Sequence, residues 1–520
     1  MTQTGNPADA GTSPVDGGHV GAVARGGALT MVGFVVSAAL QFGLVVAVTN
    51  GLTTPAAGAF LEAVALFMIL SNWGEVGTDT AMVRTVPRLR ALGRGVDIPT
   101  ALRSAALPVF VVGAVVGVVV VLSADAIAEV FFSEAERDEA VTYLRSFGLL
   151  LPVASATTVL LAATRGFGSM VPYVAVQNVG VPASRVLLVG AAVFAGSGPL
   201  VIGLAWSLPL LAALIAALLC YRLLARRDAR HWQGERRPTR ELARDVWTFA
   251  APRALAAVFG VTITWFDVLL VGALASTREA AIYAAISRLA LIGTYALQAM
   301  GMAVAPRFSE LVTLGEHDRL EHLYRIATWW MMALAWPLYI VMMVFPSLFA
   351  QLFGSSYSAG ATALVILCAA GLFNLATGNV TVLLLMSGYS KLNMLNAGGA
   401  LALNVVLNLI LIPRFGMSGA AVAWAASIVA NNLAALIQVH RRLGLRPFGD
   451  GYLVVALGTV ACFGLVAAAG RLVGGESAEA LVPVLLISTT LYAMFLWKAR
   501  GRIGLDTLVG AFGGRTHRAT

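Results

Sequence analysis

Charged residues are scarce in this sequence: Asp, Glu, Lys and Arg make up only 12% of its 520 residues, whereas 59% are apolar. A soluble protein of this length needs far more polar surface, so the low charge content excludes an ordinary soluble domain. The mean hydropathy of +0.83 points the same way. Apolar runs long enough to cross a ~30 Å hydrocarbon layer follow one another along the chain, which predicts a membrane-embedded protein.

Cysteine and histidine are also few, with three and six residues. Cys220, Cys368 and Cys462 stand in apolar stretches without the spacing of a disulfide framework, metal site or redox motif. His317 and His322, the closest histidine pair, are spaced too poorly to place two metal ligands on one helix face. We therefore expect no metal and no other cofactor. A glycine-rich phosphate loop ending in Lys-Ser or Lys-Thr is missing too, so ATP is not the direct energy source.

The chain begins with a segment rich in Gly, Asp, Thr and Pro that lacks the cationic start and short apolar core of a signal peptide. Apolar windows separated by charged or Gly/Pro breaks then predict an all-α integral membrane protein of about 14 transmembrane helices. The expected spans are 27–49, 56–81, 101–124, 141–164, 172–195, 199–224, 246–273, 279–304, 323–347, 360–386, 391–412, 416–439, 449–470 and 479–498.

Basic residues alternate between the loops in the way that the positive-inside rule requires. The loops on one side hold only Arg137, Arg278, Arg414 and Arg471. The other side carries Arg84, Arg88, Arg90, Arg94, Arg103, Arg165, the basic stretch from Arg222 to Arg244, Arg307, Arg319, Arg325, Lys391, Arg441, Arg442 and Arg446. This predicts a multi-pass protein of the cytoplasmic membrane with both termini in the cytoplasm. It also explains the net charge of +9 without a nucleic-acid partner.

The sequence repeats itself at an offset of roughly 220 residues. The matching segments are 51–60 with 272–281, 81–89 with 302–308, 165–168 with 387–390, and Leu204–Ser207 with Val422–Ala425. A duplicated six-helix unit predicts two lobes related by a pseudo-two-fold axis along the membrane normal, with a site between them. The expected divisions are a disordered tail (1–26), an N-lobe (27–225), a basic cytoplasmic linker (226–245), a C-lobe (246–442), a final helix pair (443–500) and a cytoplasmic tail (501–520).

Three local motifs resemble those of a known transporter group. They are Trp73-Gly-Glu-Val-Gly-Thr-Asp-Thr-Ala-Met-Val-Arg84, Asp267–Gly272 followed by Ala281–Leu289, and Asn404–Pro413 with Gly416 and Gly419–Ala421 behind it. With the twelve-helix repeat plus a final pair, the chain resembles the multidrug/oligosaccharidyl-lipid/polysaccharide exporter superfamily, and within it the O-antigen-type polysaccharide flippases.

The resemblance implies a transporter rather than an enzyme. Its cargo would be an undecaprenyl-diphosphate-linked oligosaccharide, moved from the inner to the outer face of the cytoplasmic membrane by alternating access for cell-surface polysaccharide synthesis. Membrane lipid and other glycan-assembly proteins would be its partners. Three alternatives stay open: a peptidoglycan-precursor (lipid II) flippase, a multidrug/cation antiporter with an acidic cleft, and a membrane glycan polymerase with a catalytic outer loop.

Four arginines within the expected helices are candidates for binding the diphosphate, namely Arg185, Arg288, Arg253 and Arg145. A charge at a helix centre costs about 2.5–3.5 kcal/mol on insertion scales, so it should face a wet cavity, a partner or an interface. Guanidinium groups also bind two phosphate oxygens at once. The structural alternative is that each arginine pairs with an intramembrane acid. For Arg288 we expect that acid to be Asp267, in the preceding helix.

Acids and amides within the spans suggest two further roles. Glu62 and Asp79, with Glu75, are candidates for coupling transport to H+ or Na+, although local hydrogen bonding also explains the two acids near the loop. Asn178 and Asn374, with Asn404 and Asn408, are candidates for binding sugar hydroxyls. Asparagines between membrane helices also hydrogen-bond one helix to another, which is the structural alternative.

Overall fold

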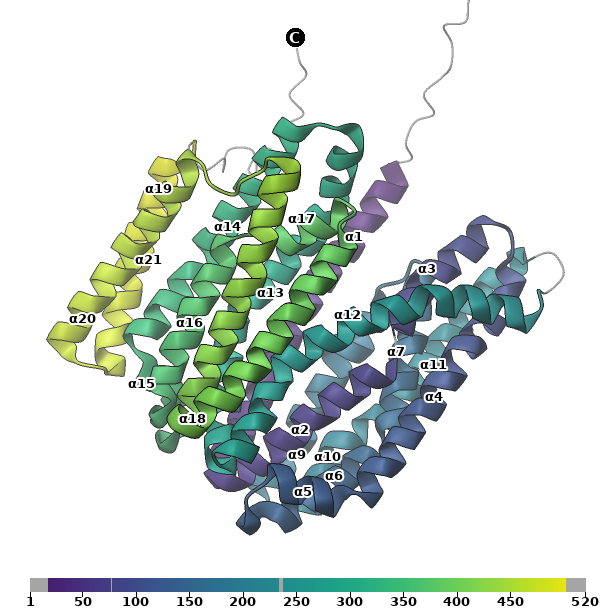
Figure 1. Ribbon diagram of the computed structural model, residues 1–520, viewed down its shortest axis with the longest axis horizontal. Helices are drawn as coiled ribbons and strands as arrows, with labels where there is room; N and C mark the ends of the chain where they lie inside the picture. Colours follow the sequence, from purple (N-terminus) through teal and green to yellow (C-terminus); the bar gives the residue numbers. More distant parts are fainter. Residues whose placement is uncertain (1–16, 76, 233–236, 502–520) are drawn as a thin grey trace, which may run out of the picture.

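Every regular element in the part of the chain that the structure describes is a helix (Figure 1). The computed structural model describes residues 17–75, 77–232 and 237–501. Eleven described helices are long and apolar enough to cross a membrane, and one bent pair raises the count to 12. The expected class, an all-α protein with many membrane spans, is confirmed.

The first half of the chain forms a bundle in which proline opens several helices. Proline occupies one of the first two positions of α4, α7, α9, α10 and α11, where its missing N–H costs no hydrogen bond. The elements are α1 (Gly17–Gly51), α2 (Thr54–Glu75), α3 (Thr78–Ala91), η1 (Gly95–Asp97), α4 (Ile98–Leu122), α5 (Ala124–Phe131), η2 (Glu134–Glu136), α6 (Arg137–Gly148), α7 (Leu151–Gly166), α8 (Val171–Tyr173), η3 (Val174–Gly180), α9 (Val181–Phe194), α10 (Pro199–Ser207), α11 (Pro209–Asp228) and η4 (Ala229–His231).

The second half contains longer helices and ends in an added pair. Ser276 caps α13 by accepting a hydrogen bond from the Glu279 backbone N–H, 3.1 Å away. The elements are α12 (Thr239–Leu274), α13 (Thr277–Leu314), α14 (His317–Val344), α15 (Pro346–Ala350), η5 (Gln351–Phe353), η6 (Ser355–Gly360), α16 (Ala361–Ala376), α17 (Val380–Met386), α18 (Ser390–Leu443), α19 (Asp450–Thr459), η7 (Val460–Leu465), α20 (Val466–Gly474) and α21 (Ala478–Ala499).

Two long elements explain why the span count differs from the expected fourteen. Helix α18 contains both expected spans 391–412 and 416–439, and it is broken at Gly416, whose backbone is non-helical (φ 54°, ψ −138°). Helix α12 contains expected span 246–273, and its apolar portion Val258–Leu274, which is shorter than a full span, is not counted among the eleven. The total of fourteen and the symmetry of the lobes stay predictions.

Two groups of helices are visible in Figure 1, α2–α11 on the right and α13–α18 on the left, with α19–α21 at the far left. We call them the N-bundle (α2–α11) and the C-bundle (α13–α18). Helix α1 packs against α9 and η3 on one side and α13 on the other, so it lies between the bundles. Helix α12 packs against α3 and α4 of the N-bundle and against α18 and α13 of the C-bundle. The two bundles are thus joined by two shared helices.

The bundles also meet directly at the end of the molecule that carries α5, which we call the α5 end. The hydroxyls of Thr54 and Ser356 are 2.8 Å apart, and those of Ser133 and Thr277 are 3.0 Å apart. At Gly58 the helices approach so closely that a Cβ would lie 2.2 Å from the Thr277 carbonyl oxygen. Glycine at this position therefore permits the contact between α2 and α13.

The expected tail and linker are more helical than the sequence suggests. Helix α1 begins at Gly17, within the expected tail, whereas residues 1–16 and 502–520 lie outside the described residues. Most of the described linker belongs to the ends of α11 and α12, and it docks on the N-bundle. Arg90 and Asp228 are 2.8 Å apart, and the Arg237 backbone N–H donates to Asp97 at 2.9 Å.

Candidate functional site

Two adjoining cavities share lining residues on α1, α12 and α13. The first, here called the central cavity, has a volume of about 310 Å³ and is lined by α1, α2, α8, η3, α9, α10, α12 and α13. The second, the C-lobe cavity, has a volume of about 390 Å³ and is lined by α1, α12, α13, α16 and α18. The side chains that line both cavities are Gln41, Trp265, Arg288 and Tyr295.

Arg185 reaches the central cavity from α9 with its guanidinium held flat. The guanidinium carbon lies 3.6 Å from the ring centre of Trp206, and its Nε donates to the Trp206 carbonyl oxygen at 2.9 Å. Trp206 is itself fixed edge-on against Phe67 and tilted against Phe147. Arg185 has no carboxylate within ion-pair distance among the described residues. Its terminal amino groups are therefore available for a ligand.

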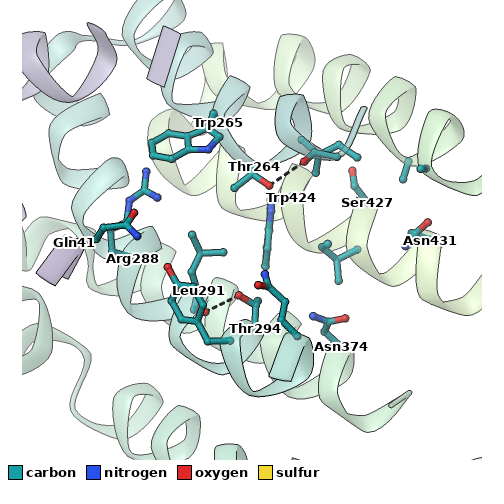
Figure 2. Close-up of a pocket in the computed structure, with 17 residues that line it drawn as sticks. Gln41, Thr264, Trp265, Arg288, Leu291, Thr294, Asn374, Trp424, Ser427 and Asn431 are labelled. Carbon is teal, nitrogen blue, oxygen red and sulfur yellow. Dashed lines mark hydrogen bonds between the residues drawn. The ribbon is translucent and has the colours of Figure 1, made fainter. Parts of the chain in front are cut away.

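Arg288 reaches the same cavity from α13. Its guanidinium lies over the ring of Trp265, 3.9 Å from the ring centre, and the side chain lines both cavities (Figure 2). No described carboxylate forms an ion pair with it. Each of the two arginines is thus held by a tryptophan rather than by an acid.

The expected pairing of Arg288 with Asp267 is wrong. Asp267 is 2% exposed and accepts hydrogen bonds from the Tyr283 hydroxyl at 3.1 Å and from Asn408 Nδ2 at 2.8 Å. Asn408 Nδ2 also donates to Asn404 Oδ1 at 3.1 Å, so the carboxylate belongs to a network linking α12, α13 and α18. Neutral donors satisfy this acid, which leaves the arginine for the cavity.

The charged side chains in the two cavities are all cationic. Arg185 and Arg288 are the charged side chains that line them, and no Asp or Glu is present among the described lining residues. Such an arrangement attracts anions and repels cations. Around the arginines, the walls combine aromatic and aliphatic side chains with neutral hydrogen-bonding groups. The guanidinium groups are therefore the part of the lining that suits an anion.

The other two candidate arginines differ. Arg145 is exposed on α6, pairs with Asp125 at 2.8 Å and lines neither cavity, so it does not join the candidate site. The physical reason is its position close to the helix end, where a long side chain reaches water. The side chain of Arg253 lies outside the described residues.

The two candidate asparagines divide between the cavities. Asn178, 4% exposed, lines the central cavity, and its Nδ2 has no hydrogen-bond partner among the described atoms. Asn374 lines the C-lobe cavity and accepts a hydrogen bond from Asn432 Nδ2 at 2.7 Å. Asn178 therefore offers an unused donor, whereas Asn374 is partly engaged.

The candidate coupling acids lie away from the cavities. Glu62 is fully buried in α2, and neither carboxylate oxygen has a hydrogen-bond partner among the described residues. It faces α12, where a Cβ added at Gly272 would lie 2.0 Å from Glu62 Oε2. Asp79, in the first turn of α3, has a carboxylate oxygen 4.0 Å from a terminal guanidinium nitrogen of Arg165, an arrangement that fits charge pairing.

The site contains residues that sequence reasoning missed, above all Trp265, Tyr295, Gln298 and Asn431. Aromatic and amide side chains are ordinary in membrane helices, so their types alone carried no signal. One signal existed: the repeat that matches Leu204–Ser207 with Val422–Ala425 places a tryptophan at the same position in each half. Both of these tryptophans line a cavity.

Within the described ranges, no group of three or more His, Cys, Asp and Glu side chains is placed to hold a metal ion. Cys220, Cys368 and Cys462 are free thiols. The chemistry available at the cavities is therefore binding by guanidinium, amide, hydroxyl and indole groups.

Comparison with known proteins identifies related families. The profile of the family described as polysaccharide biosynthesis protein matches residues 23–312, more than half of the chain, and that of the MatE family matches residues 252–410. A curated relative, the "Probable low-salt glycan biosynthesis flippase Agl15" of Haloferax volcanii, is 27% identical over 207 residues. That match covers 38% of this chain and 42% of the relative, so the chain spans less than half of the relative's length.

Solved structures share the fold. "Lipid II flippase MurJ, inward closed conformation" superposes with a TM-score of 0.70 at 13% identity, covering 92% of this chain and 99% of that one. An inward-facing multidrug resistance MATE family transporter of the MOP superfamily superposes with a TM-score of 0.59 at 17% identity, covering 82% and 94%. At these identities the likeness concerns the fold alone.

Proposed function

This chain belongs to the family of polysaccharide biosynthesis proteins, and from that premise we propose that it is a flippase for an undecaprenyl-diphosphate-linked oligosaccharide. It carries this lipid from the inner to the outer face of the cytoplasmic membrane, where the glycan enters cell-surface polysaccharide synthesis. One observation carries the proposal. Arg185 and Arg288, from opposite bundles, line one cavity to which the described residues contribute no carboxylate.

The two guanidinium groups suit a diphosphate. Arg185 uses its Nε for the Trp206 carbonyl oxygen, which leaves its terminal amino groups for phosphate oxygens. Arg288 has no described hydrogen-bond partner and is oriented by Trp265 alone. Because both are held flat by tryptophans before cargo arrives, little side-chain entropy is lost on binding. A diphosphate bridging them would draw on both halves of the protein at once.

Energetics favour a binding role over a structural one. A charged side chain at bilayer depth costs about 2.5–3.5 kcal/mol on insertion scales, and an ion pair is the usual way to offset that cost. Neither arginine has such a pair among the described residues, and both border a cavity instead. An anionic cargo supplies the missing counter-charge during transport.

The transport cycle is alternating access between the two membrane faces. Arginines hold the diphosphate, polar walls accept the glycan, and the polyprenyl tail remains in lipid between helices. An inside-negative potential favours outward movement of the head by about 2.3 kcal/mol per charge per 100 mV, so an ion gradient is not obligatory. If H+ or Na+ is coupled, Glu62 is the candidate, because it is buried between α2 and α12 without a described partner.

We infer the orientation of the protein in the membrane from the arginines of α3. Arg84, Arg88 and Arg90 lie on this helix, and Arg94 follows it, so we place the α3 end in the cytoplasm and the α5 end outside. In Figure 1 the start of α1 lies toward the same end as α3, so we propose that this end of α1 also faces the cytoplasm. The contacts between bundles at the α5 end then close the outer side.

The rival functions are less compatible with the site. A multidrug/cation antiporter needs acidic groups facing its cargo, and the described cavity walls carry arginine instead. A glycan polymerase needs a paired acid and base beside a sugar, which these walls also do not provide. A lipid II flippase shares the diphosphate chemistry, so the choice of glycan separates it from our proposal.

Translocation of lipid-diphosphate glycan in proteoliposomes tests the proposal. We expect Arg185→Ala and Arg288→Ala each to lower the initial rate at least tenfold, because each removes a charge-assisted contact of about 1.5–3 kcal/mol. Arg288→Lys should recover part of the rate, since an ammonium group keeps the charge but loses the planar pair of donors. Accessibility of the glycan to an added lectin measures the rate.

Arg145→Ala provides the matched control, because Arg145 is exposed, pairs with Asp125 and lines neither cavity. Its rate should stay within about twofold of the parent, as expected for a surface ion pair. Parent-like transport by both cavity variants would refute the site. A parent protein that moves lipid II but not other lipid-linked glycans would replace our cargo with the peptidoglycan precursor.

A further inference from the structure

Trp206 and Trp424 occupy matching positions in the sequence repeat, but their surroundings differ. Trp206 carries the Arg185 guanidinium on its ring in the central cavity. The same spacing that separates the two tryptophans in sequence, counted from Arg185, leads to Leu403, so the second half has no arginine at that position. No described cation lies over the ring of Trp424. The C-lobe cavity therefore keeps an aromatic side chain that no guanidinium covers.

The walls around Trp424 carry polar groups that the protein does not use. The indole Nε1 of Trp424, the amides of Gln298 and Asn431, and the Tyr295 hydroxyl have no hydrogen-bond partner among the described residues. Figure 2 shows Gln41 and Arg288 at one side of the cavity, Asn431 at the other, and Trp424 between them. Donors and acceptors thus surround an aromatic ring within one cavity.

Three hydroxyl groups complete this lining. Thr264, Thr294 and Ser427 each donate to a backbone carbonyl of their own helix, at 3.0, 2.6 and 2.7 Å. Each hydroxyl oxygen keeps a lone pair that can accept a hydrogen bond from a ligand. The cavity therefore offers neutral donors and acceptors in several directions, which is the requirement for a ligand with hydroxyl groups around its rim.

We propose that the C-lobe cavity is a pyranose subsite, in which Trp424 contacts the apolar C–H side of a sugar ring while the amide, hydroxyl and indole groups bind its hydroxyls. This inference rests on the proposed flippase function. A pyranose combines an apolar surface with a rim of hydroxyl groups, so it matches an aromatic ring set among neutral polar groups. A volume of about 390 Å³ falls within the range of small-molecule sites.

The position of the subsite fits the order of groups in the cargo. Sugar follows directly on diphosphate in such a lipid, and the C-lobe cavity adjoins the central cavity through Gln41, Trp265 and Tyr295, with Arg288 lining both. A diphosphate held by the arginines therefore projects its first sugars toward Trp424. Residues of the C-bundle thus contact the glycan, while one arginine from each bundle binds the diphosphate.

The charge of the subsite sets the class of sugar. Arg288 is the charged member of its described lining, and no carboxylate faces the cavity. Neutral and acidic pyranoses, such as a hexose or a uronic acid, are accepted. A sugar with a free, protonated amine is disfavoured, because its charge meets an arginine and no acid.

Binding of two lipids to the full-length protein in nanodiscs tests this subsite. The probes are undecaprenyl diphosphate without sugar and undecaprenyl diphosphate carrying a glucose–glucuronic acid disaccharide. Trp424→Leu should weaken binding of the disaccharide lipid about three- to tenfold, the effect of losing one aromatic contact, and leave the sugar-free lipid unaffected. Asn431→Ala should do the same to a smaller extent, whereas Arg288→Ala should weaken binding of both lipids.

Trp497→Leu is the matched control, because Trp497 is 70% exposed on α21 and lines neither cavity. Unchanged binding of the sugar-free lipid shows that the Trp424→Leu and Asn431→Ala variants are folded. If Trp424→Leu and Asn431→Ala bind the disaccharide lipid like the parent, the sugar subsite is refuted while the flippase proposal stands. If the parent binds neither lipid, both proposals fail. A glucosamine-bearing lipid that binds as tightly as the uronic acid form would overturn the assigned charge preference.

Discussion

At the scale of single residues, the Asp267 network is a buried polar feature outside the cavities that can be tested by substitution. Replacing Asp267 with Ala leaves the Tyr283 hydroxyl without its acceptor and Asn408 with one acceptor instead of two. An unsatisfied buried group costs about 1–3 kcal/mol, so the thermal unfolding temperature in detergent should fall by about 1–3 °C in a protein of this size. Asp125→Ala, at a site 72% exposed, should leave this temperature unchanged.

Asp267→Asn gives the complementary measurement for the same network. It keeps an oxygen acceptor at the position, so its unfolding temperature should lie between those of the parent and the Ala variant. A parent-like unfolding temperature for Asp267→Ala would show that these hydrogen bonds do not hold α12, α13 and α18 together.

At the residue scale, prediction from the sequence rested on the cost of placing a charge at bilayer depth, and the substrate-binding roles that it assigned stay predictions. Arg185 and Arg288 were selected because a cation at bilayer depth is expensive, and the structure places both at the central cavity. The pairing of Arg288 with Asp267 was wrong, because hydropathy locates a helix along the chain but does not fix its rotation. That rotation decides whether Asp267 faces Arg288 or Asn408.

At the scale of elements, the break in α18 depends on Gly416. Its φ of 54° lies in the region that favours glycine, and a Cβ would lie 2.2 Å from Glu279 Oε2. That carboxylate accepts a hydrogen bond from the Met417 backbone N–H at 2.7 Å, which secures the break. Gly416→Ala should therefore destabilise the protein by at least about 1–2 kcal/mol.

Gly399→Ala provides the control for this prediction. Gly399 also lies in α18, and apart from the adjoining backbone of its own helix no described atom lies within 4 Å of the position that its Cβ would take. Alanine should be neutral or slightly stabilising there, because it favours the helix over the unfolded chain. Thermal unfolding of both variants in the same detergent decides the question, and equal unfolding temperatures would contradict the proposed role of Gly416.

The sequence predicted elements better than their ends. Apolar runs located the helices, because in lipid the backbone N–H and C=O groups must form their hydrogen bonds within the protein, and a helix satisfies them within one segment. The start of α1 at Gly17 was missed, because a segment rich in Gly, Asp and Pro has the composition of a disordered tail. The linker was also expected as a loop, but the Asp97 and Asp228 contacts that dock it on the N-bundle join residues far apart in sequence.

At the scale of the whole molecule, the contacts at the α5 end can be locked to test alternating access. The Thr54 and Ser356 hydroxyls lie 2.8 Å apart across the bundles, so cysteines at both positions should form a disulfide. In a background with Cys220, Cys368 and Cys462 replaced by Ala, oxidation should lower translocation at least tenfold, and a reductant should restore it. The proteoliposome assay measures both states.

Each single-cysteine variant is a control for this cross-link, because it reacts with the oxidant but cannot join the bundles. Its transport should not respond to oxidation. Full transport by the oxidised double variant, with the disulfide verified by mass spectrometry, would mean that the bundles do not separate at the α5 end during the cycle.

Helix α12 has a mechanical consequence for such movement. This helix packs on α2, α3 and α4 of the N-bundle and on α13 and α18 of the C-bundle. Separating the bundles therefore requires the helix either to flex or to peel away from one of them. Gly260 lies midway along α12 and borders the C-lobe cavity. A sugar bound in this cavity would contact the α12 backbone near Gly260, and a glycine lets a helix bend more easily than other residues do. The cargo would therefore bind next to the position at which α12 bends.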